Sequence, residues 1–175
     1  MMRKWLFSLV GLLIVGLLGY SGLGFYVLQA SSTDTNASCA IGDSGTRIPQ
    51  FACRWYLEHQ LTSAKANGDA QSVLHLAIGA YPTDPEQAQK IMELALSEGA
   101  QINGFSPVTG YPPLHEAVLL NEPRLAEFLL QRGADPEIED QNKGMTAREL
   151  LSAIEERNPE KDLSRMVTLL QEKRE

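Results

Sequence analysis

The feature that most constrains this chain is residues 110–136, which read as two short helices joined by a tight break. Pro113 pre-sets the backbone angle φ for a first helical turn. Pro123 disfavours helical geometry in the residue before it, so the first helix must end there. Gly133 can take the left-handed conformation that ends the second helix. Such a hairpin cannot bury its apolar stripes alone. The stripes consist of Leu114, Ala117, Val118, Leu125, Phe128 and Leu129.

Two motifs in this segment carry a resemblance to a known family. The sequence Pro-Pro-Leu-His-Glu-Ala occupies residues 112–117, and Gly-Ala-Asp follows at 133–135, eighteen positions after the histidine. This pattern and its spacing resemble the ankyrin repeat. The resemblance implies an all-α solenoid that binds other proteins and has no catalytic activity.

Residues 67–175 are expected to form this ankyrin domain of about two and a half repeats with helical caps. The first repeat, residues 70–103, spans 24 positions from His75 to the closing Gly99, six more than the second repeat. Prolines in residues 81–86 predict that the extra residues form an elaborated loop. The second repeat covers residues 108–137. The third repeat, residues 142–173, is degenerate and lacks the closing Gly-Ala-Asp, as is typical of a terminal cap.

Two segments precede the repeats. Residues 30–49 are rich in Ser, Thr, Asn, Asp and Gly, which predicts a polar, solvated linker. Residues 50–66 read as a helix with a broad apolar face that includes Phe51, Trp55 and Leu61. We expect this helix to cap the open end of the stack.

Residues 1–29 predict a signal-anchor helix. Arg3 and Lys4 precede the charge-free run 5–28, whose 24 residues would extend about 36 Å as a helix, against about 30 Å of bilayer hydrocarbon. A signal peptide, whose apolar region is usually about 7–15 residues long, would leave a cleaved, soluble periplasmic protein as the alternative. Because basic residues lie only before the run, the remainder is expected to be exported. We therefore expect a single-pass inner-membrane protein with its C-terminal domain in the periplasm.

The two cysteines, Cys39 and Cys53, both lie on the side predicted to be exported. An even number of cysteines in an oxidising compartment predicts a disulfide, with two unpaired thiols as the alternative. Closing a loop of about 15 residues would stabilise the fold by about 3 kcal/mol in the chain-entropy estimate.

The sequence contains no catalytic, metal or cofactor motif, so we predict a chain that is not an enzyme and takes no cofactor. His75 and His115 occupy the turn position of their repeats, where an imidazole fixes the loop by bonding backbone groups. The acidic residues 135–140 predict a solvated turn. After Arg3 and Lys4 are set aside, 13 basic residues remain against 22 acidic ones, a balance that disfavours nucleic acid as a partner.

In proteins that resemble ankyrin stacks, partners contact the loop tips and the exposed side of each first helix. Several residues at these positions are apolar or aromatic, as interface anchors often are. The alternative is that Leu119 and Leu120 pack under the long loop of the preceding repeat. The candidate partner-binding residues are Phe105, Val108, Thr109, Tyr111, Leu119, Leu120, Asn142, Lys143 and Met145.

These expectations favour a non-catalytic adaptor that presents an acidic ankyrin domain to a protein partner in the periplasm. Small exported ankyrin-like proteins resemble two classes of protein. One is the immunity protein that neutralises a secreted antibacterial effector, such as a phospholipase. The alternative is a companion that protects or assembles a periplasmic enzyme such as a catalase. An active site built from the insert loops is a third hypothesis, and the lack of a paired nucleophile and base disfavours it.

Overall fold

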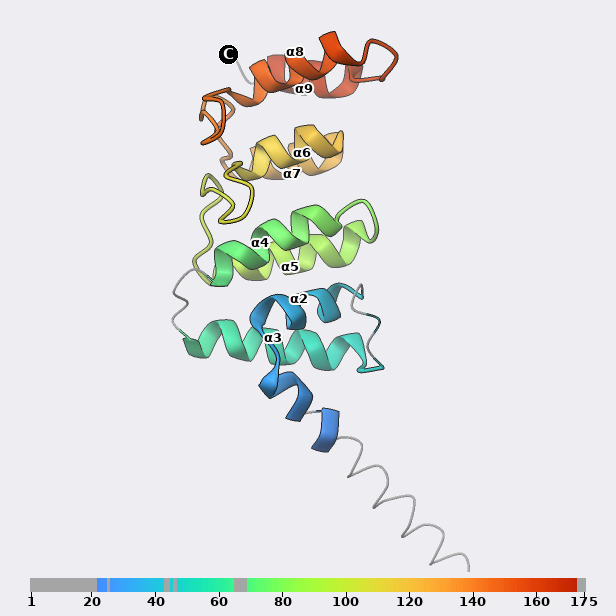
Figure 1. The fold of residues 1–175 in the computed structure, drawn as a ribbon, viewed down its shortest axis with the longest axis vertical. Helices are drawn as coiled ribbons and strands as arrows, with labels where there is room; N and C mark the ends of the chain where they lie inside the picture. Colours follow the sequence, from blue (N-terminus) through green and yellow to red (C-terminus); the bar gives the residue numbers. More distant parts are fainter. Residues whose placement is uncertain (1–21, 25, 43–44, 46, 65–68, 173–175) are drawn as a thin grey trace, which may run out of the picture.

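The computed structural model describes residues 22–172 except 25, 43–44, 46 and 65–68. Within these residues the chain is helical and contains no strand. The labelled helices form four antiparallel pairs that stack one above another (Figure 1). The helices are α2 (Thr33–Ile41), α3 (Gln50–Ala64), α4 (Asp69–Ala80), α5 (Pro85–Ser97), α6 (Pro113–Leu120), α7 (Pro123–Gln131), α8 (Ala147–Arg157) and α9 (Ser164–Glu172).

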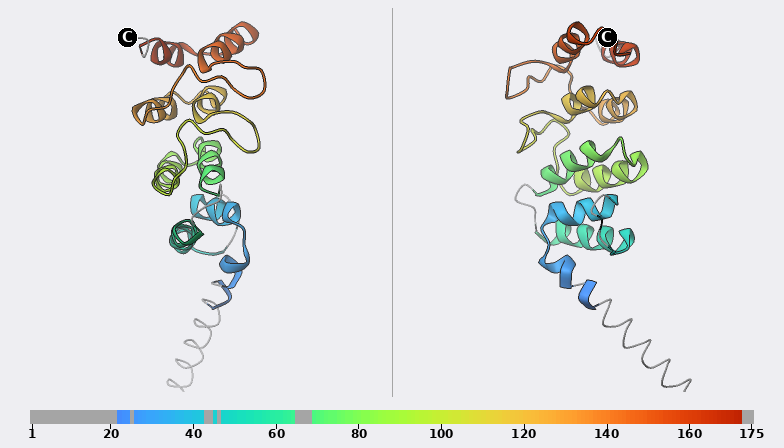
Figure 2. Two further views of the ribbon diagram at one scale, coloured as in Figure 1. Left: turned by 90° about the vertical axis from the view of Figure 1, so that its left-hand side faces the viewer. Right: turned by 45° about the vertical axis from the view of Figure 1, so that its right-hand side comes forward.

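The first helices of the pairs form a row, and the long loops lie on one side of the stack, called the loop side. The first helices of the pairs contact one another in the order α2, α4, α6 and α8. The connections from α5 to α6 and from α7 to α8 project from the same side of the stack (Figure 2). Gly99 and Gly133, which start these connections, have φ values of 102° and 91°, in the left-handed region that glycine tolerates. Both loops therefore leave their helices in the same direction.

The prediction of a solvated linker over residues 30–49 is wrong for α2. Ser32 caps this helix by accepting a hydrogen bond from Thr35 N at 3.3 Å, and Gly42 ends it with φ of 99°. Ala37 and Ala40 are buried because small side chains let α2 lie close to its neighbours. A composition of small and polar residues hides this burial from a hydropathy pattern. The stack thus begins one helix pair earlier than the motifs indicate.

Helix α3 lies at the end of the stack, but only part of its predicted apolar face is buried. Cys53, Leu57 and Leu61, spaced four residues apart, are buried. Phe51 and Trp55 are 69% and 60% exposed. The disulfide explains the difference, because Cys39 bonds Cys53 with 5.8 Å between their Cα atoms and so turns the cysteine side of α3 toward α2. The opposite side carries the two aromatic rings.

The extra residues of the first repeat do not form an elaborated loop. Helix α5 has 13 residues against nine in α7, so four of the six extra residues add a helical turn. The connection between the paired helices is residues 81–84 in the first repeat and 121–122 in the second, which takes the other two. Asp84 Oδ1 accepts a hydrogen bond from Gln87 N at 3.1 Å and caps α5. Tyr81, within the predicted loop, is buried in the core.

The degenerate third repeat still folds as a helix pair. Thr146 and Glu149 form a reciprocal capping box at the start of α8. Leu163, Met166 and Leu170 bury the last apolar stripe.

Among the described residues, no helix has both the length and the apolar character needed to cross a bilayer. Most of the predicted anchor, residues 1–21 and 25, lies outside the described part of the chain.

Candidate partner-binding groove

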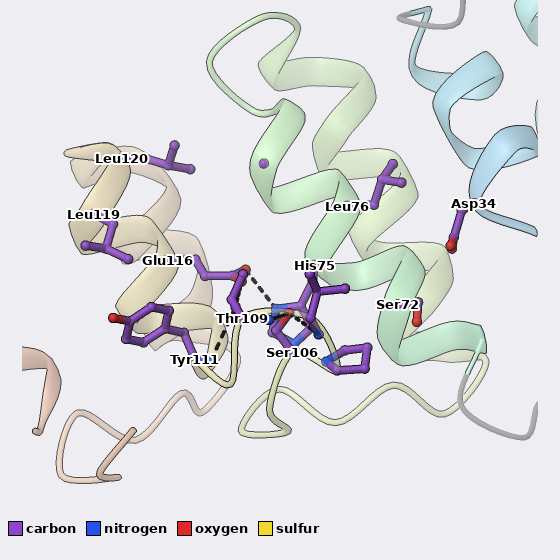
Figure 3. Close-up of a pocket in the computed structure, with 13 residues that line it drawn as sticks. Asp34, Ser72, His75, Leu76, Ser106, Thr109, Tyr111, Glu116, Leu119 and Leu120 are labelled. Atoms are coloured by element: carbon purple, nitrogen blue, oxygen red, sulfur yellow. Dashed lines mark hydrogen bonds and ion pairs between the residues drawn. The ribbon is translucent and has the colours of Figure 1, made fainter. Parts of the chain in front are cut away.

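A groove with a volume of about 460 Å³ lies between α4 and α6 on the loop side of the stack. Figure 3 shows side chains from α4, from the loop before α6 and from α6 itself turned toward this space. Five of the residues predicted to bind a partner line the groove. They are Val108, Thr109, Tyr111, Leu119 and Leu120.

The floor of the groove is a hydrogen bond between two side chains that joins the two helices. His75 Nδ1 on α4 lies 2.7 Å from Glu116 Oε2 on α6. His75 Nε2 lies 3.2 Å from the carbonyl oxygen of Gly104, and Thr109 Oγ1 donates to Glu116 Oε1 at 2.9 Å. These bonds connect α4, α6 and the loop between them. The groove therefore has a shape fixed by polar contacts beneath its apolar walls.

The loop that carries Val108 is a tight turn held by Ser106. Ser106 Oγ accepts a hydrogen bond from Thr109 N at 3.2 Å, and Ser106 O accepts one from Gly110 N at 2.9 Å. Gly110 has φ of 69°, which a side chain there would strain. Val108 at the tip is 90% exposed. An aliphatic side chain held at this exposure on a fixed turn is suited to contact a partner.

The following loop is built around Asp140, which the sequence placed in a solvated turn. Asp140 is instead buried, and its carboxylate accepts hydrogen bonds from the backbone N–H groups of Asn142, Lys143 and Met145 at 2.7, 2.8 and 3.0 Å. Burial alone would raise the pKa of Asp140, but these three donors outweigh it and hold the pKa below its usual range. His115 Nε2 donates to Met145 O at 2.8 Å, so both motif histidines contact a loop carbonyl.

The remaining predicted residues lie outside the groove. Asn142 Nδ2 donates to Thr109 O at 2.8 Å and so ties the two loops together. Lys143 is exposed beside it, whereas Phe105 and Met145 are half-buried. The structure thus separates the predicted residues that line the groove from those that lie in the loops beside it.

Leu119 and Leu120 differ in role. Leu119 is 41% exposed at the wall of the groove, while Leu120 is half-buried and packs against the core. Tyr111 is half-buried and stacks on His115, with 6.1 Å between ring centroids. Leu119 and Val108 are therefore the groove's exposed large apolar side chains.

The other wall of the groove includes Leu76 and Gly79 of α4, which sequence reasoning did not select. The sequence contained a signal for Gly79. Gly79 follows the motif histidine His75 by four residues, as Leu119 follows His115. Applying the same motif positions to the first repeat would have identified Gly79 but not Leu76.

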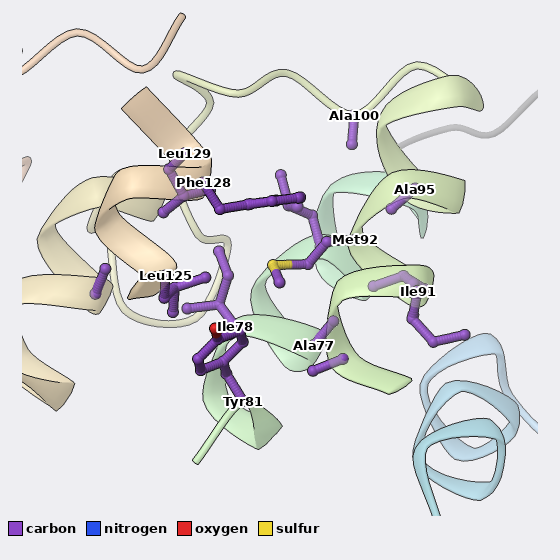
Figure 4. Packing of buried hydrophobic residues seen from close by; sticks show 14 of the residues in the cluster. Ala77, Ile78, Tyr81, Ile91, Met92, Ala95, Ala100, Leu125, Phe128 and Leu129 are labelled. Atoms are coloured by element: carbon purple, nitrogen blue, oxygen red, sulfur yellow. The ribbon is translucent and has the colours of Figure 1, made fainter. Parts of the chain in front are cut away.

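Behind the groove, the four helices of the two central repeats share one apolar core (Figure 4). Ile78, Met92 and Leu125 are fully buried there, and Phe128 is 7% exposed. This core fixes the relative positions of α4 and α6, on which the groove depends.

Comparisons with known proteins point to the same repeat. The family model described as "Ankyrin repeat" matches residues 109–141. Human "Ankyrin repeat and SOCS box protein 6" is 39% identical over 67 residues, 38% of this chain and 16% of that protein. Its mouse counterpart is 41% identical over 64 residues, 37% of this chain and 15% of that protein. The pig "NF-kappa-B inhibitor alpha" is 35% identical over 92 residues, 53% of this chain and 26% of that protein.

The chain thus spans at most 26% of the length of these relatives. Ankyrin repeats are generally non-catalytic modules that bind other proteins. The side chains that converge on the groove include aliphatic groups, hydroxyls and a histidine hydrogen-bonded to a glutamate, which suit binding. The matched motif and the stacked helix pairs agree, and the chain contains an ankyrin repeat at residues 109–141.

Proposed function

We propose that this chain is a protein-binding ankyrin module held at the inner membrane, with its repeats in the periplasm and its partner seated in the α4–α6 groove. The observation that carries the binding site is the pair of exposed aliphatic residues, Val108 and Leu119, on a polar-bonded floor. Apolar side chains held in place before binding lose little entropy on association, which favours affinity.

The disulfide supports the periplasmic compartment. Cys39 and Cys53 are both buried and bonded to each other. Disulfides persist in oxidising compartments and are rare in the reducing cytosol. The arrangement of basic residues supports the same orientation, because Arg3 and Lys4 precede the apolar run and none follows it closely.

The specific role we propose is that of an immunity protein, which binds a secreted antibacterial effector such as a phospholipase and blocks it. A preformed binding surface supports this role, and the proposed periplasmic placement would put that surface where such effectors act. The partner would bring an apolar segment to the groove, and basic residues in it would be attracted by the chain's net charge of −7.

Capture of partners by the full chain tests this function. The wild-type chain, Leu119→Lys and Gln131→Lys would each be purified from detergent-solubilised membranes with their bound proteins. Gln131 is exposed on α7, so its variant carries the same new charge outside the groove. We expect wild type and Gln131→Lys to retain the same partner and Leu119→Lys to lose it.

If all three chains retain the same partner, the groove is not where that partner binds. An effector enzyme among the captured proteins would support the immunity role, whereas a housekeeping enzyme such as a catalase would contradict it in favour of a companion role.

The compartment is tested separately by a reporter fused after Glu175. An export-dependent reporter should be active and a cytoplasm-dependent one silent. The reverse pattern would refute the periplasmic placement without bearing on the groove.

A further inference from the structure

The exposed apolar side chains of the described residues fall into two groups. Seven large apolar residues are exposed, and two of them, Val108 and Leu119, belong to the groove. The other five lie toward the N-terminal end of the described residues, in the extension of residues 22–30 and on α3. Their exposed fractions range from 41% to 69%. These residues are Leu23, Tyr26, Val27, Phe51 and Trp55.

The extension is joined to the folded stack without a free linker. Leu28 is only 5% exposed, and its carbonyl oxygen accepts a hydrogen bond from Asn36 Nδ2 of α2 at 3.2 Å. Asn36 Nδ2 also donates to Gln60 Oε1 of α3 at 3.0 Å. Ser31 Oγ donates to Val27 O at 2.7 Å. The end of the apolar run 5–28 is therefore part of the first helix pair.

The second part of this surface is the outer side of α3. This helix ends the stack on the side where the extension leaves it (Figure 1). Cys53 and Leu57 are buried in the stack, while Trp55 is 60% exposed and exposed Phe51 borders a pocket shared with Ala40 of α2 and Gln87 of α5. Trp55 stacks on His59 with 6.0 Å between ring centroids, so the aromatic surface continues along α3.

We propose that this end of the stack rests on the lipid bilayer, with Phe51 and Trp55 in the headgroup region beside Tyr26. The proposal deepens the proposed membrane placement and rests on it. Because Leu28 is buried and fixed to α2, a bilayer that receives the apolar residues before it must lie directly against this helix pair. Tyrosine and tryptophan favour the membrane–water interface, where a ring is apolar on one side and hydrated on the other.

Charged neighbours set the depth of this contact. Arg54 and Glu58, both exposed on α3 next to Trp55, would be costly in hydrocarbon but are tolerated among headgroups. Arg54 would also be attracted to anionic lipids. The rings therefore enter the interface and α3 does not sink below it.

The contact would fix how the groove faces its partner. Packed helices lie about 8–10 Å apart, so a groove between the second and third helix pairs stays within a few helix layers of the membrane. A partner that works on the bilayer would meet the groove there.

Fluorescence quenching in reconstituted vesicles tests the contact. The full chain carrying Trp5→Phe, in which Trp55 is the remaining tryptophan, would be placed in phosphatidylcholine–phosphatidylglycerol vesicles. The quenchers would be lipid brominated near the glycerol end of its acyl chains and aqueous iodide. The control chain carries Trp5→Phe, Trp55→Phe and Val108→Trp, which puts the reporter at the exposed tip of a loop.

We expect brominated lipid to quench Trp55 several-fold more than the Val108→Trp reporter, and iodide to show the reverse order. If the chain stays in carbonate-washed vesicles but iodide quenches both reporters equally, the contact is refuted while the anchor stands. Protection of Trp55 from both quenchers would also refute it, because protein, such as a second copy, would then cover α3. Loss of the chain from washed vesicles would refute the membrane placement itself.

Discussion

Asp140 offers a sharp test of how the groove's loops are held. Its buried carboxylate accepts three backbone hydrogen bonds and has no cationic side chain among its bonded partners. In the Asp140→Asn variant the side chain keeps its shape, but one of its two oxygens becomes an N–H₂ group. That group faces a backbone N–H that it cannot bond, so at least one hydrogen bond is lost.

The size of the effect follows from these bonds. A hydrogen bond to a charged group contributes about 1.5–3 kcal/mol, against about 0.5–1.5 kcal/mol for a neutral pair. Losing one such bond and weakening the other two should lower the free energy of unfolding by about 3 kcal/mol at pH 7. The matched control is Asp135→Asn, because exposed Asp135 accepts its hydrogen bond from Glu137 N at 2.9 Å in a solvated turn. This control should change stability by about 0.5 kcal/mol or less.

The difference in the free energy of unfolding between wild type and Asp140→Asn should also depend on pH. Because the backbone donors hold the pKa of folded Asp140 below its unfolded value of about 3.9, its carboxylate stabilises the fold fully above that value. The contribution is lost as the pH falls through the lower, folded-state pKa. The gap between wild type and Asp140→Asn should therefore be constant near neutrality and shrink below about pH 4.

Urea unfolding of the full chain in detergent, followed by far-ultraviolet circular dichroism, would measure both effects. Equal destabilisation by Asp140→Asn and Asp135→Asn would refute the role assigned to the buried carboxylate. A gap that persists unchanged in acid would refute the charge as its source.

Three further predictions concern the fold. Reducing the bond between Cys39 and Cys53 should lower the free energy of unfolding by about 3 kcal/mol, measured as the urea midpoint with and without reductant; an unchanged midpoint would contradict this. Leu125→Ala, at a fully buried position, should cost about 2–5 kcal/mol in the same assay, and a loss under 1 kcal/mol would contradict its place in the core. Gly133→Ala, at φ of 91°, should lower the melting temperature, whereas Gly79→Ala within helix α4 should raise it; the same sign for both would refute the backbone argument.

The central repeats were predictable because prolines and glycines mark their helix ends. Pro113, Pro123 and Gly133 each stand where the structure starts or ends a helix. Helix α2 was not predictable from hydropathy, since its burial uses alanines and a buried asparagine. Its main clue was the cysteine pair, which implies that two segments lie side by side.

Helix α3 shows how an apolar pattern can mislead. Phe51 and Trp55 are more hydrophobic than Cys53, so they define the apparent apolar face. The disulfide nevertheless puts Cys53 inside and the rings outside. A broad apolar distribution leaves the helix orientation undetermined, and a single covalent contact decides it.

Part of the site was also readable from motif positions. Val108 and Leu119 were selected because the repeat places them at a loop tip and on an exposed helix side, and both line the groove. The burial of Asp140 was not readable, because it depends on three backbone groups that converge only in the folded loop. Composition alone indicated solvation there.

Site-specific photo-crosslinking in living cells tests the central claim, that the α4–α6 groove binds a protein partner. A photoreactive amino acid would replace Leu119 in one chain and exposed Gln131 of α7 in another, both as the full chain in its native membrane. The groove position should give a discrete crosslinked protein of another kind, and the α7 position should not. The same crosslinked protein from both positions, or one from Gln131 alone, would contradict the claim.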